Sequence, residues 1–600
     1  MYGSRRCWIV SSVLAALLVG ALVAVLVLRP WAGPEPQRFP RAAVAANGFE
    51  CASIGRAILE KNGSAVDAAI ATLFCEGAAC AQCMGLGGGF LATVYDAPSG
   101  RVRVLNARER APAATTRDMF ANVSSTVGGL AIAVPGELRG YGELYRAYGR
   151  LPWRDLVMPA ANMVRRGHRV NAYMARVLNT YSGIIKAEPS MREVYVNEAT
   201  GEVWKEGDLI IEPVLGRTLE VIAEEGPEAM HNGSLTDSLV DDIRRHGGII
   251  TKDDMLNYKT EWQEPIPIPL TTDYTLYSVP LPGSGSILAF ILNMLRGSSQ
   301  SEAGDAGGWL SAAPGRASER LFWPGGPAAP NSDLYWHRVV ETFKYAYAKR
   351  TGLGDPSRFN VTHDIRELER NLSDAAWAAA HRELVDELRT YNDWKHYGAI
   401  FENTEDHGTA HVVVIAPDGS VVSATSTINF IWGCQRRSTS LGIMLNNEMD
   451  DFAIPDRQSA YGLPPSPANM LEPGLQPLSS MTPSIVLNKN NEVQLVVGAA
   501  GGTKITTQVA LITRATMLEG NDLPSTMNRP RLHHQLLPME VQHESDFDAG
   551  VIDTLRRKGH ATTELGPTAG FAAIVAAVRD RDGYFVPQTD RRRVGSIDGF

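Results

Sequence analysis

The sequence has no excess of positive charge, few cysteines, and none of the short motifs that mark common metal and nucleotide sites. Lys and Arg number 57 against 66 Asp and Glu in 600 residues, a formal net charge of −9, which argues against the basic face of a nucleic-acid-binding protein. Six cysteines are too few for a disulfide scaffold. The sequence contains no Walker loop, no HExxH, no paired CxxC zinc motif and no GxSxG elbow.

Long uncharged runs are also missing, with one exception near the start. Hydrophobic residues make up 44% and charged residues 20% of the chain, which is typical of a globular protein. Residues 8–28 carry no charge, and a helix of that length spans about 31 Å, close to the thickness of a bilayer core. A cleaved signal peptide has a shorter apolar core. We therefore expect a transmembrane signal anchor at 8–28, after a cytosolic tail at 1–7 and before a Pro-rich spacer at 29–42.

Five glycosylation sequons follow the predicted anchor, at Asn62, Asn122, Asn232, Asn360 and Asn371. Such tripeptides also arise by chance, but their joint position favours the outer side of a membrane. Arginines flank both ends of the anchor, so the positive-inside rule barely decides the orientation. We predict a single-pass type II protein of the plasma membrane with an extracellular body.

Alternating apolar residues predict three β-hairpins. The first hairpin has the strands FLATVYD and RVRVLNAR on either side of Pro-Ser-Gly. The second has AHVVVIA and SVVSATSTI on either side of Pro-Asp-Gly, and the third is PSIVLNKNNEVQLVVG. Ser64 is expected to cap a helix of small residues. The glycine run at 85–89 follows that helix and precedes a strand, which favours close backbone packing over a dinucleotide loop. The stretch at about 297–335, rich in Gly, Ser, Ala and Pro, indicates a surface insertion.

Several longer motifs occur in one order along the chain: LNARERAP, YAYAKRTGLGDP, GTAH, TSTIN, NNEMDDF, PLSSMTPS, GAAGGT and PRLHHQLLP. In these motifs the sequence closely resembles the gamma-glutamyltransferase (glutathione hydrolase) family, over roughly residues 43–600. The resemblance implies an α/β fold of four αββα layers, the N-terminal nucleophile (Ntn) hydrolase fold. It also implies a cut between Gly408 and Thr409 that leaves a heavy chain at 43–408 and a light chain at 409–600, joined as a heterodimer.

The residue types around the implied cut suit acyl transfer. A threonine hydroxyl needs an adjacent base, and the α-amine that cleavage would free on Thr409 has an ordinary pKa of about 8. By resemblance, Thr427 orients the Thr409 hydroxyl and amine, and Asn429, on the same strand face, helps to hold the amino end of the substrate. Gly501 and Gly502 are expected to supply an oxyanion hole. Taken singly, each of these has a plain structural alternative, such as a strand residue or a turn glycine.

A γ-glutamyl donor carries a free α-ammonium and a free α-carboxylate, so its site needs acids and a cation. The resemblance assigns Glu448 and Asp451, spaced i and i+3, to the ammonium. It assigns Arg108 to the carboxylate, with Ser479 and Ser480 adding hydrogen bonds.

The implied reaction is hydrolysis or transfer of the γ-glutamyl group of glutathione and its conjugates through a threonine acyl-enzyme. Water, an amino acid or a dipeptide accepts the acyl group, and no metal or organic cofactor is implied. Two alternatives remain open within the enzymes: a hydrolase restricted to conjugates such as leukotrienes, and an acylase-like amidohydrolase. From another class, a non-catalytic membrane scaffold with the same fold also remains open.

Apart from Cys7 in the predicted cytosolic tail, the cysteines divide into an implied pair and three whose roles the sequence leaves open. The resemblance pairs Cys51 with Cys75. Cys80 and Cys83 form either a local disulfide or two inert thiols, because no thioredoxin-like context surrounds them.

Ile431 occupies the position at which animal members of the family commonly carry a tyrosine, in a flap over the pocket. The sequence leaves the effect of this isoleucine on the flap open.

Overall fold

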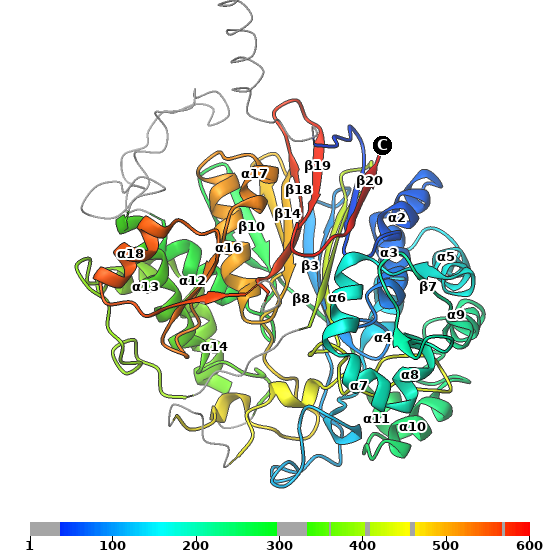
Figure 1. Ribbon diagram of the computed structural model, residues 1–600. Coiled ribbons are helices and arrows are strands. Elements are labelled where there is room, and N and C mark those ends of the chain that lie inside the picture. The colour runs from blue at the N-terminus through cyan, green and yellow to red at the C-terminus, as the bar shows by residue number, and fades with distance from the viewer. Residues whose placement is uncertain (1–35, 297–332, 359–361, 402–407, 456–462, 567–569) are drawn as a thin grey trace, which may run out of the picture. The chain divides into compact units, whose positions relative to one another are not determined.

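Two antiparallel β-sheets lie face to face at the centre of the structure, a computed structural model (Figure 1). It describes residues 36–296, 333–358, 362–401, 408–455, 463–566 and 570–600. The seven-stranded sheet is ordered β20 (Ser596–Gly599), β1 (Ala43–Ala46), β11 (Ala410–Ile415), β12 (Val421–Thr427), β2 (Gly89–Asp96), β3 (Arg101–Ala107), β8 (Glu261–Gln263). The six-stranded sheet is ordered β19 (Phe585–Thr589), β18 (Ala573–Arg579), β14 (Val493–Ala500), β13 (Ser484–Asn488), β10 (Tyr274–Ser278), β9 (Ile266–Pro269).

Strand β11 is covered on both of its faces. Val412 and Val414 belong to the core beneath the helices, whereas Val413 and Ile415 belong to the core between the two sheets. This alternation follows from the two-residue period of a strand. It explains why the sequence AHVVVI is apolar at nearly every position.

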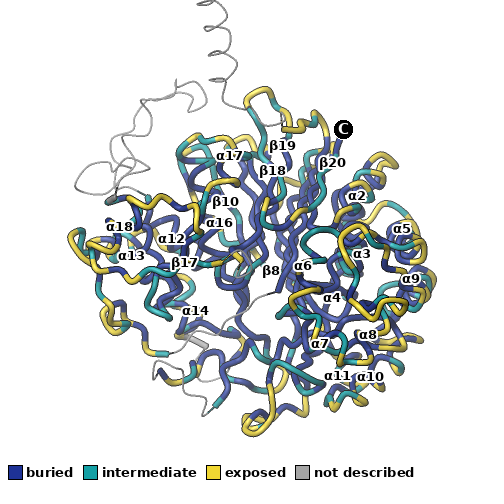
Figure 2. Tube along the Cα trace, viewed as in Figure 1, coloured by how far each residue is buried: buried dark blue, intermediate teal, exposed yellow. Residues whose placement is uncertain are grey.

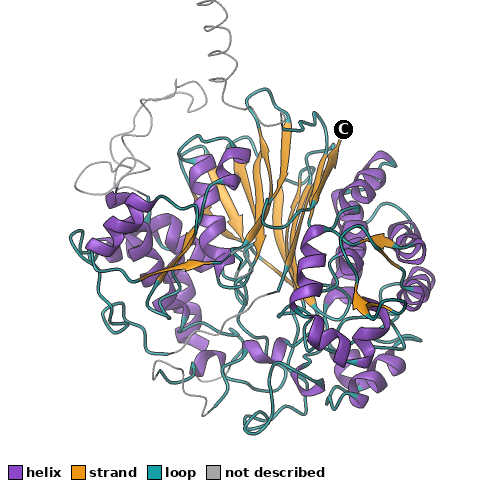
Figure 3. Cartoon of the chain, viewed as in Figure 1, coloured by secondary structure: helices purple, strands orange, loops and turns teal. Residues whose placement is uncertain are grey.

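Helices cover the outer face of each sheet, as Figure 3 shows. On the seven-stranded sheet, α3 (Ala65–Ala79) contacts β11 and β12, and α2 (Cys51–Glu60) and α5 (Trp153–Arg166) pack against α3. On the six-stranded sheet, α16 (Lys504–Met517) contacts β14 and packs against α12 (Gly285–Met294). The expected four-layer αββα architecture is confirmed.

Further helices and small strands complete the structure, and Figure 2 shows that the buried residues follow the central strands. The further helices are α4 (Glu137–Tyr148), α6 (Ala172–Thr180), α7 (Ser182–Ala187), α8 (Pro189–Tyr195), α9 (Pro213–Glu225), α10 (Thr236–Arg245), α11 (Lys252–Asn257), α13 (Asp333–Arg350), α14 (Thr362–Ser373), α15 (Ala375–Arg382), α17 (Leu523–Asn528), α18 (Ala549–Arg557) and the 3₁₀ turns η1 (Gly129–Ala131), η4 (Glu448–Asp451) and η5 (Pro467–Asn469). The small strands are β4 (His168–Arg169), β5 (Val196–Asn197), β6 (Glu202–Val203), β7 (Leu209–Ile210), β15 (Leu532–His533), β16 (Val541–Glu544) and β17 (Thr562–Leu565).

The three hairpins predicted from the sequence are confirmed as β2–β3, β11–β12 and β13–β14. In the β11–β12 turn, Gly419 has a φ of +85°, a conformation that glycine adopts without strain. Ser64 caps α3 as expected, because its side chain accepts the N–H of Asp67 while the Asp67 carboxylate accepts the N–H of Ser64.

The glycine run at 85–89 lets chain segments meet with no side chain between them. A Cβ on Gly87 would lie 2.0 Å from the carbonyl oxygen of Met444, and one on Gly88 would lie 2.0 Å from that of Thr427. No other residue fits at such distances. Close backbone packing is therefore confirmed as the reason for this run, and it fixes the end of β12.

The folded body begins earlier than the sequence suggested. We expected a spacer through residue 42, but the N–H of Phe39 donates to the carbonyl of Phe585 at 2.9 Å, and Ala42 and Phe600 exchange backbone hydrogen bonds. The predicted tail and anchor, the start of the spacer and residues 297–332 of the insertion lie outside the described residues. Within the described ranges, no helix is both long enough and apolar enough to cross a membrane.

The sequons differ in exposure. Asn62, Asn122 and Asn232 are exposed and Asn371 is half-buried, while Asn360 lies outside the described residues. Their glycosylation stays a prediction.

One disulfide links α2 to α3. Cys51 and Cys75 are bonded, as the resemblance implied. Cys80, Cys83 and Cys434 are buried free thiols. Of the two possibilities for Cys80 and Cys83, the free thiols are therefore confirmed.

Removing the Cys51–Cys75 disulfide should destabilise the fold. The bond closes a loop with a sequence separation of 24, which corresponds to about 3.5 kcal/mol of chain entropy. We expect a Cys51→Ser, Cys75→Ser double variant to unfold at clearly lower urea concentration. Cys434→Ser, which removes a buried free thiol, is the matched control. Non-reducing peptide mapping that finds Cys51 as a free thiol in the native protein contradicts the pairing.

Candidate active site

Two threonine hydroxyls converge on one carbonyl at the start of β11. The Thr409 hydroxyl donates to the carbonyl oxygen of Gly408, the residue before it. Thr427, the last residue of β12, donates to the same oxygen at 2.5 Å. All three residues are buried. We expected Thr427 to orient Thr409 itself, whereas its hydroxyl donates to the peptide bond that precedes Thr409.

Asn429 follows β12 in a left-handed conformation, with a φ of +69° that few non-glycine residues adopt. Its N–H donates to Thr427 Oγ1 at 2.8 Å, and its side-chain amide donates to the carbonyl of Asn447 at 3.1 Å. Asn429 Oδ1 is buried and accepts no hydrogen bond from the described residues. A buried amide oxygen in that state is suited to accept a hydrogen bond from a bound ligand.

Arg108 lies directly after β3 and contacts both of the predicted substrate acids. Its guanidinium pairs with Glu448, and its Nη2 lies 2.5 Å from Asp451 Oδ2. The two acids are the first and last residues of the 3₁₀ turn η4, so the predicted i, i+3 arrangement on one side is confirmed. The ammonium and the carboxylate of an amino acid are attached to one carbon, so a site that binds both needs acids and a cation in contact, as in this cluster.

The acids outnumber the cation in this cluster. Glu109 lies 3.7 Å from Arg108 and is also buried. Burial raises the pKa of Glu109 to about 7, although the Arg108 charge opposes the shift. Burial, opposed by Arg108 and reinforced by the negative charge of Glu109, raises the pKa of Glu448 well above its usual range. Three buried carboxyl groups around one guanidinium favour a bound cation.

Ser479 and Ser480 are buried and follow Pro477, whose carbonyl accepts a hydrogen bond from Arg108 Nε at 3.4 Å. Their role in binding the substrate carboxylate stays a prediction. The Ser479 hydroxyl accepts the N–H of Met481 at 3.2 Å. The Ser480 hydroxyl accepts a hydrogen bond from Arg350, the last residue of α13, at 3.2 Å. Arg350 was missed by the sequence analysis, although it lies within the motif YAYAKRTGLGDP.

Gly501 and Gly502 connect β14 to α16, with φ values of +133° and +63°. A Cβ on Gly501 would lie 2.6 Å from the Cα of Ala572, so a side chain does not fit there. The close approach of Ala572 explains the glycine at 501, and the oxyanion hole expected from Gly501 and Gly502 stays a prediction.

A cavity of about 620 Å³ opens beside Gly501, and Ile431, at the predicted flap position, contributes to its wall. Two acids line the cavity, Glu544 and Asp546, and they offset only part of the positive charge of its lining. The basic residues of the lining are Arg176, Lys504, Arg591, Arg592 and Arg593. Arg593 also donates to the carbonyl of Thr409, and the sequence analysis did not identify it.

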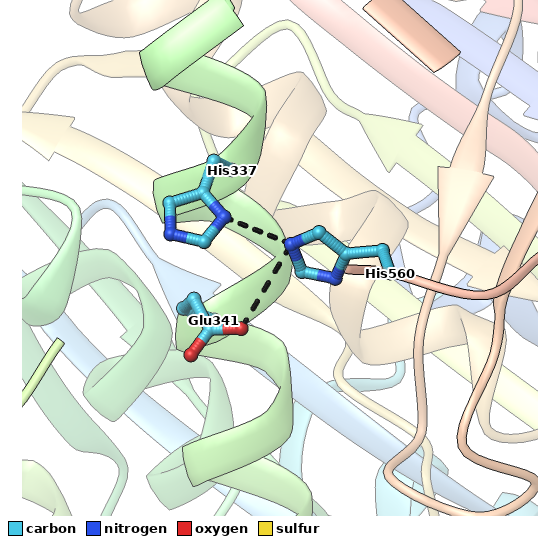
Figure 4. A group of neighbouring side chains, drawn as sticks. All are labelled: His337, Glu341 and His560. Atoms are coloured by element: carbon cyan, nitrogen blue, oxygen red, sulfur yellow. Dashed lines mark hydrogen bonds and ion pairs between the residues drawn. The ribbon is translucent and has the colours of Figure 1, made fainter. Parts of the chain in front are cut away.

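Among the described residues, one group of side chains has the residue types of a metal site, and it lies far in sequence from the residues above. His337 and Glu341 of α13 face His560, and one ligand atom of each lies within 4.8 Å of the others (Figure 4). Lys344 already places its ammonium 3.6 Å from the Glu341 carboxylate, and His337 Nδ1 lies 2.8 Å from His560 Nε2. The existing hydrogen bonds and this ion pair account for the cluster without a metal.

Known proteins match the chain over nearly its whole length. The profile of the family described as gamma-glutamyltranspeptidase matches residues 51–600. Scoloptoxin SSD14 of Scolopendra dehaani is 39% identical, over 94% of this chain and 92% of its own. Glutathione hydrolase 5 proenzyme of Mus musculus is 36% identical, over 99% of this chain and 98% of its own. Glutathione hydrolase 3 of Arabidopsis thaliana is 33% identical, over 90% of this chain and 81% of its own.

A solved structure agrees with the architecture. Cephalosporin acylase from Bacillus halodurans superposes with a TM-score of 0.75 at 21% identity, covering 96% of this chain and 99% of its own. At that identity the likeness concerns the fold alone. Together with the relatives, it identifies the chain as an enzyme with the Ntn-hydrolase fold that belongs to the gamma-glutamyltranspeptidase family.

Proposed function

We propose that this enzyme cuts itself between Gly408 and Thr409 and then transfers γ-glutamyl groups through Thr409. The observation that carries the proposal is the convergence of the Thr409 and Thr427 hydroxyls on the Gly408 carbonyl oxygen. The mouse relative is named a proenzyme, which supports the proposed cut.

In the proposed self-cleavage, the Thr409 oxygen attacks the carbonyl carbon of Gly408. The hydroxyl of Thr427 stabilises the negative charge that develops on the carbonyl oxygen. The C–N bond then breaks, the Thr409 nitrogen takes the proton, and an ester joins Gly408 to the Thr409 side chain. Water hydrolyses this ester, which leaves a carboxylate on Gly408 and a free α-amine on Thr409.

The freed amine then serves as the base in each turnover. It takes the proton of the Thr409 hydroxyl as the oxygen attacks the γ-carbonyl of glutathione, and it returns that proton to the leaving amine of cysteinylglycine. The N–H groups of Gly501 and Gly502 stabilise the oxyanion. Water, an amino acid or a dipeptide then attacks the γ-glutamyl ester and restores Thr409.

The donor's amino-acid end is assigned to the acidic cluster beside the nucleophile. Asn429 Oδ1, Glu448 and Asp451 accept hydrogen bonds from the α-ammonium, which has three to donate. Arg108 binds the α-carboxylate, which replaces part of its present pairing with the two acids. The cationic cavity beside Gly501 suits the remaining carboxylate of the leaving peptide.

The two chains are expected to stay together after the cut. In the seven-stranded sheet, β1 of the heavy chain lies between β20 and β11 of the proposed light chain, and β2 of the heavy chain pairs with β12 of the light chain. Separating the chains would break hydrogen bonds along several strand pairs at once.

The full-length protein should therefore run as two bands on a denaturing gel and as one species on a native gel. N-terminal sequencing of the smaller band should begin at Thr409, and the purified protein should release cysteinylglycine from glutathione. A single band of full length from an active preparation overturns the self-cleavage. A cleaved protein that hydrolyses no γ-glutamyl compound overturns the reaction.

A further inference from the structure

Arg593 donates to the carbonyl oxygen of Thr409, whereas Thr427 donates to the preceding carbonyl, that of Gly408. Arg593 lies between β19 and β20 and is 4% exposed. One end of its guanidinium, Nη1, donates to the carbonyl oxygen of Thr409, and Nη2 donates to the hydroxyl of Tyr173 at 2.8 Å. The guanidinium is thus held in place by both of its terminal nitrogens.

No carboxylate among the described residues forms an ion pair with Arg593. Its neighbour Arg592 differs, because it pairs with Glu544 and Asp590. The guanidinium charge therefore acts on the main chain of Thr409 with little direct compensation.

The groups facing Arg593 are mostly neutral near pH 7. Burial raises the pKa of Cys80 and of Tyr173, so both stay protonated, and Cys83 lies 3.9 Å from the Tyr173 hydroxyl. Burial also raises the pKa of Glu76 to about 7, although the Arg593 charge opposes that shift. Glu76 is thus only partly ionised at neutral pH, and the acids Glu544 and Asp546, which line the same cavity as Arg593, belong to its wider surroundings.

The other titratable groups around the start of β11 come from three further directions. On β11 itself, burial lowers the pKa of His411 to about 3, so the ring is neutral. Beside β12, Glu137 accepts a hydrogen bond from Ser426, and burial raises its pKa to about 8. Lys504 lines the same cavity as Arg593 and, like it, is positively charged.

We propose that Arg593 is a positioning residue for the acyl transfer: it fixes the main chain of Thr409, and its positive charge keeps the amine freed by cleavage unprotonated near neutral pH. This inference rests on the proposed function, because the amine exists only after the cut. The nitrogen and the carbonyl oxygen of Thr409 belong to one residue, so a cation on the oxygen lies within about 6 Å of the nitrogen.

A charge at that distance has a measurable effect. At an effective dielectric constant of about 20, two like charges about 6 Å apart disfavour protonation by roughly one to two pH units. An ordinary α-amine has a pKa of about 8. Arg593 thus lowers the pKa of the base below the ordinary value of an α-amine, which leaves more of the amine free to accept a proton at pH 7.

The test compares kcat/KM against pH for purified, fully cleaved Arg593→Gln and Arg593→Lys variants. Activity should fall at low pH as the amine becomes protonated, and this fall is the acidic limb of the curve. Removing the charge in Arg593→Gln should move the midpoint of the acidic limb to higher pH by about one unit or more, and lower kcat/KM about tenfold at pH 7. The loss should largely disappear at high pH. Arg593→Lys keeps the charge and should keep the limb near its wild-type position.

Two further variants separate this effect from other causes. Arg514→Gln removes another buried arginine of the light-chain segment, one that pairs with Glu519, and should leave the limb in place. Glu76→Gln should also retain an acidic limb, because the amine and not Glu76 produces it. If Arg593 only braced the fold, Arg593→Gln would lower activity equally at every pH, and that outcome overturns the inference.

A direct measurement covers the case in which Arg593→Gln does not mature. The Thr409 amine of the wild-type enzyme can be titrated by ¹⁵N NMR after threonine labelling, and its pKa should lie clearly below the ordinary value of about 8. A value of about 8 or higher overturns the role of Arg593. An uncleaved or inactive wild-type protein would instead count against the proposed function.

Discussion

Replacing Thr409 by alanine should yield a single uncut chain with no γ-glutamyl hydrolysis. The same hydroxyl is proposed to attack Gly408 during maturation and the donor during turnover, so its loss removes both reactions. Removing the nucleophile of a hydrolase that works through an acyl-enzyme lowers kcat by about 10⁴-fold or more. The measurements are a denaturing gel and release of cysteinylglycine from glutathione.

Two substitutions at the same position control for changes in packing. Thr409→Val keeps the β-branched shape of the buried side chain without the hydroxyl, and it should behave like Thr409→Ala. Thr409→Ser keeps the hydroxyl and should still be cut, although more slowly. Full cleavage and activity in Thr409→Val would remove Thr409 from the reaction, whatever the behaviour of the other two variants.

The sequence predicted the hairpins because their signals are local, whereas the four layers were expected only from the resemblance to the gamma-glutamyltransferase family. Alternating residues around Asp418-Gly419 are enough to predict the β11–β12 hairpin, and the structure confirms it. It also confirms Ser64 as a cap and the glycine run at 85–89 as a backbone contact. Each of these depends on residues that are close in sequence or on the special freedom of glycine.

The partners across the site could not be predicted in the same way. Arg593 reaches the carbonyl of Thr409 across 184 positions, and the spacing of its neighbours gives no sign of this contact. Arg350 stands at the end of α13, where a basic residue is common for reasons unrelated to any site. Both become visible only when the fold shows an arginine buried beside a predicted site residue.

The structure brings together three of the predicted substrate residues, Arg108, Glu448 and Asp451, but their contacts with one another were not foreseen. The sequence analysis assigned the two acids to the α-ammonium of the donor and the arginine to its α-carboxylate. In the structure, Arg108 pairs with both Glu448 and Asp451, across more than 300 positions. The ligand-free cluster thus partly satisfies its own charges. Binding an α-ammonium and an α-carboxylate exchanges these internal pairs for pairs with the ligand, so the net gain is a difference between two sets of contacts.

This difference sets the expected effect of replacing Arg108 by lysine. Lysine keeps the charge that the two acids need, but it cannot form the forked pair that a guanidinium makes with a carboxylate. Hydrogen bonds to charged groups contribute about 1.5–3 kcal/mol, which corresponds to roughly 10- to 150-fold in binding. The donor's carboxylate does not react and is held alike before and during the reaction, so KM should rise while kcat changes little.

Chain cleavage should be intact in Arg108→Lys, because Gly408 offers no α-carboxylate for Arg108 to bind. Arg110→Lys is the matched control, since Arg110 is only half-buried and donates to the carbonyl of Gly474. It should leave KM unchanged. If Arg108 only braced the end of β3, the lysine variant would give less folded protein, and the surviving cleaved enzyme would keep its KM. An unaltered KM in purified, cleaved Arg108→Lys therefore removes Arg108 from donor binding, and it also weakens the assignment of Glu448 and Asp451, which lie against it.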